Sequence, residues 1–146
     1  MKHVRHIRTP SGFLRVLQQG DDVLALLGAL MQTENVHSAS VMGFGFVAKA
    51  RFGFFDFERR DYKPRDYTDL EVTGFTGTLA WMNGKPAIHA HASGADRSFK
   101  LVGGQVLDLI VGRGSFEITI IEHPHRLERA MEPALGAKVL QLGTVA

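Results

Sequence analysis

The pair Asn83-Gly84 is the feature that most constrains how this chain can fold. Both residues tolerate the positive φ angles that the two central positions of a type I′ turn require, and this turn joins antiparallel strands. Apolar residues recur through the segment 70–81 before the pair, and a second apolar-rich segment, 87–92, follows it. We therefore predict a β-hairpin whose two strands are joined at Asn83-Gly84.

One helix is well marked elsewhere in the chain. Gly20-Asp21-Asp22 precedes leucines at helical spacing, so we predict a helix that ends around residues 32–35, with Asp21 or Asp22 as its N-cap. A weaker pattern predicts a short helix over 126–137, interrupted by Pro133.

The other segments carry mainly strand signals. Apolar, β-branched and aromatic residues predict further strands over 3–18 (with a turn at 10–12), 36–46, 47–57, 99–111, 115–122 and 139–142. A charged loop is expected over 58–66, where Pro64 breaks the pattern. Many antiparallel strands, one good helix and short connections predict an α+β domain dominated by sheet.

Length and composition narrow the class of protein. A chain of 146 residues predicts a single domain over 1–146. Cysteine is absent, which excludes disulfides, thiolate metal sites and cysteine nucleophiles and fits a reducing compartment. No apolar region follows the basic start of the chain as in a signal peptide, and no apolar run is long enough to span a bilayer. We expect a cytoplasmic protein without a membrane partner.

The net charge of +2 gives little support for a nucleic-acid partner, because such a partner leaves clustered basic residues and not a small average excess. Two groups of basic residues are present, near the N-terminus and in the segment 59–65, and the second is interleaved with acidic residues. The candidate phosphate contacts are Arg5, Arg8, Arg59, Arg60 and Arg65. A solvated, mixed-charge loop is the favoured interpretation of the second group.

His89 and His91 are the residues most suggestive of a site. In a strand the residues i and i+2 point to the same face, with Cα atoms about 6.6 Å apart, so two imidazoles can converge on a metal ion or a polar ligand. A third ligand would have to come from elsewhere; the downstream segment Gly103-Gly104 offers Gln105, and His37 is an additional candidate. The alternative is a pair of partly buried histidines that are hydrogen-bonded to backbone or to a neighbouring subunit. The two glycines allow either backbone approach to a ligand or tight packing at a subunit junction, and packing is favoured.

Seven segments, in this order, resemble the PPC domain (plants and prokaryotes conserved), also called domain of unknown function 296. They are Gly20-Asp21-Asp22, Val41-Met42-Gly43-Phe44-Gly45, the aromatic strand through Phe55, Leu70-Glu71-Val72-Thr73-Gly74-Phe75-Thr76-Gly77-Thr78-Leu79, Gly84-Lys85-Pro86-Ala87-Ile88-His89-Ala90-His91, Gly103-Gly104-Gln105-Val106-Leu107 and Gly114-Ser115-Phe116-Glu117-Ile118. The resemblance covers roughly residues 12–122. Their order and spacing carry it, since no single motif is specific.

The resemblance implies a sandwich of antiparallel sheet with one main helix, a fold shared with a zinc-dependent acetolactate decarboxylase. It also implies a homotrimer. Plant members carry the domain beside AT-hooks that bind DNA, and stand-alone bacterial members are labelled as DNA-binding by that association. Some similar proteins hold a metal with three histidines, two from the His-x-His strand and one after the Gly-Gly pair.

This chain departs from the family pattern twice. It has no Arg-Gly-Arg core of an AT-hook, and Gln105 stands where the third histidine would be. An amide oxygen is a poor zinc ligand beside imidazole, so we expect no required cofactor and at most weakly held zinc.

The sequence therefore predicts a stand-alone PPC-domain protein that acts as a homotrimer and is DNA-associated or regulatory, with non-specific DNA binding. The alternative is a small-molecule-binding protein or a metal-dependent enzyme that uses His89 and His91 in an intersubunit cleft, with Glu71 or Glu117 as acid or base. A nucleophile elbow, a P-loop and a dinucleotide-binding fingerprint are all missing, which favours a protein that is not an enzyme.

Overall fold

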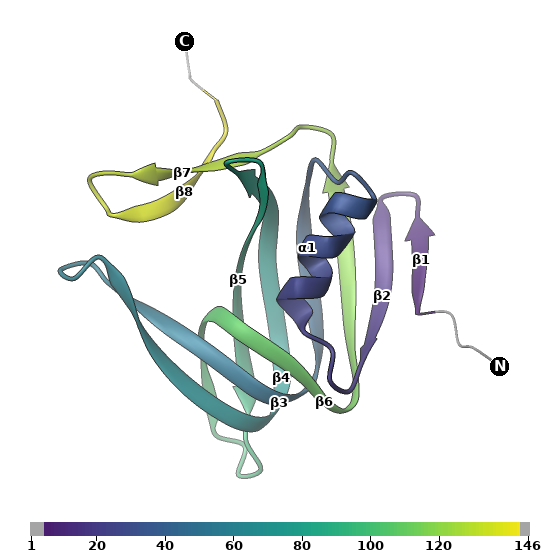
Figure 1. Cartoon of the computed structure of the whole chain (residues 1–146). Coiled ribbons are helices and arrows are strands. Elements are labelled where there is room, and N and C mark those ends of the chain that lie inside the picture. The colour runs from purple at the N-terminus through teal and green to yellow at the C-terminus, as the bar shows by residue number, and fades with distance from the viewer. Residues whose placement is uncertain (1–4, 144–146) are drawn as a thin grey trace.

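The computed structural model describes residues 5–143, which form one large, strongly bent sheet with a single helix packed on it (Figure 1). Its elements are β1 (His6–Thr9), β2 (Gly12–Gln18), α1 (Val23–Thr33), β3 (Ser38–Asp56), β4 (Asp61–Met82), β5 (Lys85–Ala95), β6 (Leu101–His123), β7 (Glu128–Glu132) and β8 (Ala137–Gln141). The strand order is β1-β2-β6-β3-β4-β7-β8, and β5 pairs with both β4 and β6. All neighbours are antiparallel except β4 and β7.

Three very long strands, β3, β4 and β6, turn this sheet into a sandwich. The second half of β4 and the first part of β6 border β5 on its two edges, while the rest of each strand continues into the opposite part of the sheet. Irregularities in register, near Gly45 in β3 and Gly74 in β4, let the strands bend. Gly45 has a φ of 151°, and a Cβ there would lie 2.2 Å from the Ser115 carbonyl oxygen, so only glycine fits.

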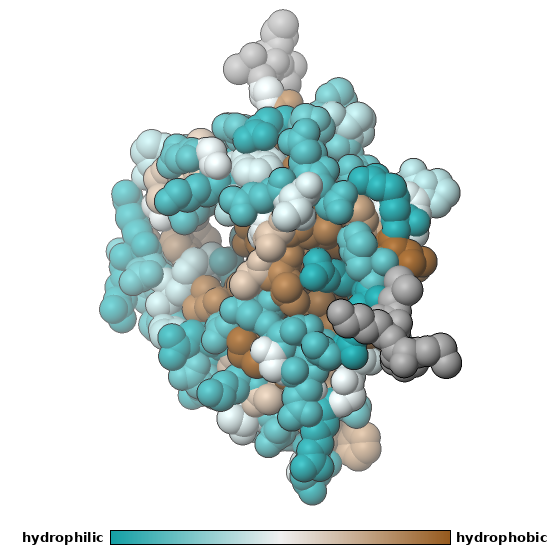
Figure 2. Space-filling model, turned by 45° about the vertical axis from the view of Figure 1, so that its right-hand side comes forward, coloured by the Kyte–Doolittle hydropathy of each residue, from teal (hydrophilic) through white to brown (hydrophobic). Residues whose placement is uncertain are grey.

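The helix α1 covers the inner face of the sheet. Asp22 caps it by accepting a hydrogen bond from the Ala25 amide at 3.0 Å, as the sequence predicts. The largest fully buried side chains of the core come from β2, α1, β4 and β6 and include Phe13, Leu27, Met31, Phe75, Phe116, Ile118 and Ile120. Some apolar side chains are not buried in the core. Figure 2, which brings the β1 side forward, shows apolar side chains in the middle of the surface with polar side chains around them.

The predicted hairpin is confirmed: Asn83 and Gly84 have φ angles of 52° and 74° and join β4 to β5. The adjacent predictions 36–46 and 47–57 are halves of the single strand β3, and 99–111 and 115–122 are halves of β6.

Two predicted segments are wrong. The expected loop over 58–66 is mostly strand, because β4 begins at Asp61 and pairs with β3 from there. The expected helix over 126–137 is instead the strand β7 and the turn that leads to β8. No helix within residues 5–143 has the length and apolar character to cross a membrane.

Candidate functional site

The histidine pair lies on the outer face of the sheet, opposite to α1. His91 is paired in register with Thr76 of β4 on one side and with Gln105 of β6 on the other, and His89 is paired with Thr78. The ring centroids of the two histidines are 5.1 Å apart. The structure therefore brings His89, His91 and Gln105 together: strand alternation predicts this for the two histidines, and the family resemblance implies it for Gln105.

A cavity of about 760 Å³ opens beside this group. His89 and Gln105 line it together with residues of the β3–β4 hairpin, the β4–β5 turn and the β7–β8 hairpin. Figure 1 shows where these three elements lie in the fold. A volume of this size is typical of small-molecule sites, whose range is roughly 300–1,000 Å³.

Tyr62 connects the β3–β4 hairpin to the histidine group. Its hydroxyl donates a hydrogen bond to the side-chain oxygen of Gln105. Burial raises the pKa of Tyr62, although the bond to Gln105 and the charge of Arg129 act in the opposite direction. The phenol is therefore neutral at physiological pH, and it occupies the amide oxygen that Gln105 would need for a metal.

Arg129 is a basic residue whose charge acts on this group. Its Nε atom is buried and has no hydrogen-bond partner within the described part of the chain. Burial lowers the pKa of Arg129, and the nearby Tyr62 partly offsets this. Burial, followed by the charges of Arg129 and His91, lowers the pKa of His89, which is therefore neutral at pH 7.

The residues between positions 5 and 143 include no group of three histidine, aspartate or glutamate side chains placed to hold a metal. His37 is exposed just before β3 and does not complete a set with His89 and His91. The two glutamates considered as acid or base do not line the cavity either: Glu71 and Glu117 border other hollows of the surface. At this site a metal would therefore meet only the imidazoles of His89 and His91 and the amide of Gln105, whose oxygen is already hydrogen-bonded to Tyr62.

Gly103 and Gly104 serve close strand packing. A Cβ at Gly103 would lie 2.3 Å from the carbonyl oxygen of Ala92, and one at Gly104 would lie 2.8 Å from that of Gly53. Both contacts are with backbone of the same chain and not with a subunit junction as expected, so any side chain at these positions would push β6 away from β5 or β3.

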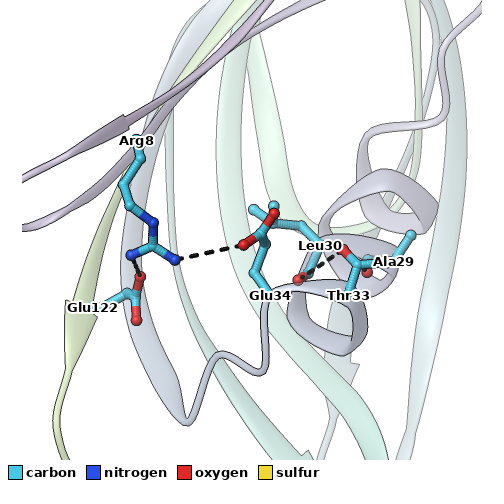
Figure 3. Close-up of polar contacts among 6 residues, drawn as sticks. All are labelled: Arg8, Ala29, Leu30, Thr33, Glu34 and Glu122. Atoms are coloured by element: carbon cyan, nitrogen blue, oxygen red, sulfur yellow. Dashed lines mark hydrogen bonds and ion pairs between the residues drawn. The ribbon is translucent and has the colours of Figure 1, made fainter.

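The candidate phosphate contacts do not form one patch in a single chain. Arg8 pairs with Glu34 and Glu122 at 3.5 and 3.4 Å (Figure 3), and its guanidinium also lies 4.5 Å from the centre of the Phe13 ring. Arg60 donates to the Pro133 carbonyl oxygen at 3.2 Å and lines the cavity.

Three candidate arginines remain exposed and form no ion pair with another described residue: Arg5, Arg59 and Arg65. Arg5 precedes β1, whereas Arg59 and Arg65 belong to the β3–β4 hairpin at the other side of the molecule (Figure 1).

The sequence reading missed Tyr62 and Arg129. Both fall in the segments whose structure was predicted wrongly, as a loop and as a helix. A signal for the second was available, because Pro133 and Gly136 bracket a turn between two short segments that can pair.

Comparison with known proteins agrees with this fold. The family model of the Plants and Prokaryotes Conserved (PCC) domain matches residues 8–124. A solved structure of a candidate DNA-binding protein from Ralstonia eutropha JMP134 is 45% identical, with 95% of this chain and 96% of that chain covered and a TM-score of 0.92. No protein of curated description matches the sequence.

More distant structures share the fold alone. A metal-containing protein from Archaeoglobus fulgidus is 22% identical over 97% of this chain and 99% of that chain, with a TM-score of 0.82. Acetolactate decarboxylase from Bacillus subtilis subspecies spizizenii is 13% identical over 82% of this chain and 56% of that chain, with a TM-score of 0.58. These likenesses confirm the predicted α+β, PPC-like fold, and the match over residues 8–124 shows that the chain belongs to the Plants and Prokaryotes Conserved domain family.

Proposed function

We propose that this protein acts as a homotrimer that associates with DNA weakly and without sequence preference. The observation that carries the proposal is the likeness, at 45% identity over nearly the whole chain, to a protein named as a candidate DNA-binding protein. A cytoplasmic location, favoured by the cysteine-free sequence, is part of the proposal.

The available charges explain why such binding would be weak. Arg5, Arg59 and Arg65 are exposed and unpaired among the described residues, and they are scattered over one chain. Assembly of three copies would bring several such arginines within reach of one duplex. Phosphate contacts of this kind are lost as salt rises, and they carry no sequence information.

An anisotropy titration with labelled duplex DNA at low and at physiological salt tests this role. We expect binding at low salt that falls steeply with salt and that the double substitution Arg59→Gln, Arg65→Gln weakens. Arg51→Gln is the matched control, because Arg51 lies on the same hairpin but is already paired with Asp66 at 2.7 Å. No binding at low salt would remove the DNA role, and discrimination between AT-rich and GC-rich duplexes would contradict the proposed mode.

A second candidate function is small-molecule binding, or metal-dependent catalysis, at the histidine pair. The cavity beside His89 favours it. His91 also lies in the same row across the outer face as Met42, through Thr76, so a second copy seated on this face would come close to His91. In this reading the cavity and the histidines form an intersubunit cleft.

A further inference from the structure

We propose that the cavity beside His89 binds a small organic anion, a carboxylate or a phosphate monoester, through the guanidinium group of Arg129. The proposal rests on the second candidate function and names its ligand class. It is independent of the DNA-associated role.

The charges that line the cavity are strongly unbalanced. Four basic side chains line it, Arg60, Lys85, Arg129 and Lys138, against the single carboxylate of Asp61. None of the four is in an ion pair with another residue of the described part, 5–143. Positive charges gathered around a concave surface attract an anion and repel a cation.

Arg129 is the anchor, because it lacks the partner that a buried donor needs. Its Nε is shielded from solvent and is bonded to nothing within residues 5–143. A buried donor without a partner costs about 1–3 kcal/mol, and more when it is charged. The planar fork of a guanidinium matches the two oxygens of a carboxylate or phosphate, and Arg129 lines the cavity and is only partly buried, so an anion there would pair with its charge.

The groups around Arg129 suit an organic anion better than a bare inorganic ion. Tyr62 occupies the oxygen of Gln105 and leaves the amide NH₂ of that residue as a donor. Neutral His89 adds a ring nitrogen that can donate. Apolar side chains complete the walls, namely Phe55, Met82, Leu107 and Met131, and they provide a surface for a hydrocarbon part.

Part of the anion-binding wall lies outside the residues that match the family model. Arg129, Met131 and Lys138 belong to the β7–β8 hairpin, beyond the residues 8–124 that match the family model. The hairpin is fixed in place by the Trp81 amide, which donates to the Leu127 carbonyl oxygen at 2.9 Å, and by Arg126, whose guanidinium lies 4.4 Å from the Trp81 ring centre. Gly136 also packs against Arg60.

The test is a calorimetric titration of the full chain with four probes of similar size: benzoate, phenyl phosphate, benzyl alcohol and benzylamine. We expect at least one of the two anions to bind and the neutral and cationic probes not to bind. Whichever anion binds more tightly separates a carboxylate from a phosphate site. Arg129→Gln should weaken anion binding by at least about tenfold, the usual effect of losing one charge-assisted contact. The control is Arg97→Gln, an exposed arginine in the β5–β6 turn, which should leave binding unchanged.

A second measurement, on the unaltered chain, avoids dependence on the folding of Arg129→Gln. The imidazole of His89 can be titrated by NMR with and without the bound anion. The titratable groups near it are Arg129, His91 and Tyr62, and Lys85, Lys138, Arg60 and Asp61 line the same cavity. A negative ligand beside Arg129 should raise the pKa of His89.

The outcomes separate the ligand class from the underlying function. Anion binding that is equally strong in Arg129→Gln, or that leaves the pKa of His89 unchanged, overturns the proposal. Binding of benzyl alcohol alone overturns the anionic class and leaves a ligand-binding cavity in place. Displacement of the bound anion by duplex DNA also overturns it, because the cavity would then hold a nucleic-acid phosphate.

Discussion

The residue that decides the metal question is Gln105. Its amide oxygen accepts the Tyr62 hydroxyl and is a hard ligand, whereas zinc prefers imidazole nitrogen beside His89 and His91. We expect the purified protein to hold little zinc after dialysis, and we expect Gln105→His to raise zinc affinity about tenfold or more. Metal analysis of both proteins, with Asp108→His on the exposed face of the same strand as control, checks this.

Full zinc occupancy in the unaltered protein would mean that a further ligand completes the site, for instance from a second copy. If Gln105→His gains no more zinc than Asp108→His, the metal site of the family does not transfer to this chain.

His89 should make stability depend on pH. Burial lowers its pKa in the folded state, so the unfolded chain takes up a proton first as the pH falls through the ordinary histidine value of about 6.5. The contribution of His89 is therefore present at neutral pH and is lost on acidification. Urea midpoints measured between pH 7 and pH 5 should fall less in His89→Gln than in the unaltered chain.

His125→Gln, an exposed histidine, serves as the control and should keep the original pH dependence. An identical pH profile for His89→Gln and the unaltered chain would show that His89 is as accessible to protons in the folded state as in the unfolded one.

At the level of elements, the correct predictions rest on local rules. Asn83-Gly84 sets the β4–β5 hairpin and Asp22 sets the start of α1, because each acts through residues close in sequence. Residues 58–66 were wrongly predicted as a loop because Pro64 interrupts the strand pattern. Its position in β4 pairs with Gly53 alone among the described strands, so the missing N–H of proline lies on a free edge and costs no ladder bond. The pairing of β7 with β4 at Trp81 is a long-range contact, which no local sequence pattern predicts.

The hairpin turn gives a prediction at this scale. Gly84 has a φ of 74° and nothing near its missing Cβ, so Gly84→Ala suffers a conformational penalty alone. We expect it to lower the free energy of unfolding by about 1 kcal/mol. Gly74→Ala is the matched control, since Gly74 is also unobstructed but has no positive φ. Urea denaturation measures both, and equal stabilities would argue against the type I′ turn.

For the whole molecule, the sequence predicted half of the candidate site. Strand alternation places His89 and His91 on one face and the family resemblance adds Gln105 to it, and in the structure Gln105 is paired in register with His91. The cavity could not be predicted, because Tyr62 and Arg129 reach it from two hairpins that are far apart in the sequence. Such an arrangement depends on how β3 and β4 bend and on where β7 docks, which are properties of the assembled sheet.

The outer face of the sheet carries the last prediction, the homotrimer. Leu14, Val16, Met42 and Phe44 are exposed on it, with Met42 at 51% and Phe44 at 54% exposure. The registers place Leu14 and Met42 on the two sides of Thr119, and Val16 and Phe44 on the two sides of Glu117. An apolar patch of this kind marks an interface, and three copies are what the family resemblance implies. Light scattering should give a trimer at micromolar concentration. Met42→Glu and Phe44→Glu should each give a monomer that remains folded, because a carboxylate there would be buried without a partner. Leu135→Glu, in the β7–β8 turn, should leave the trimer intact. A monomeric unaltered chain, or trimers in both face variants, would place the interface elsewhere or remove it.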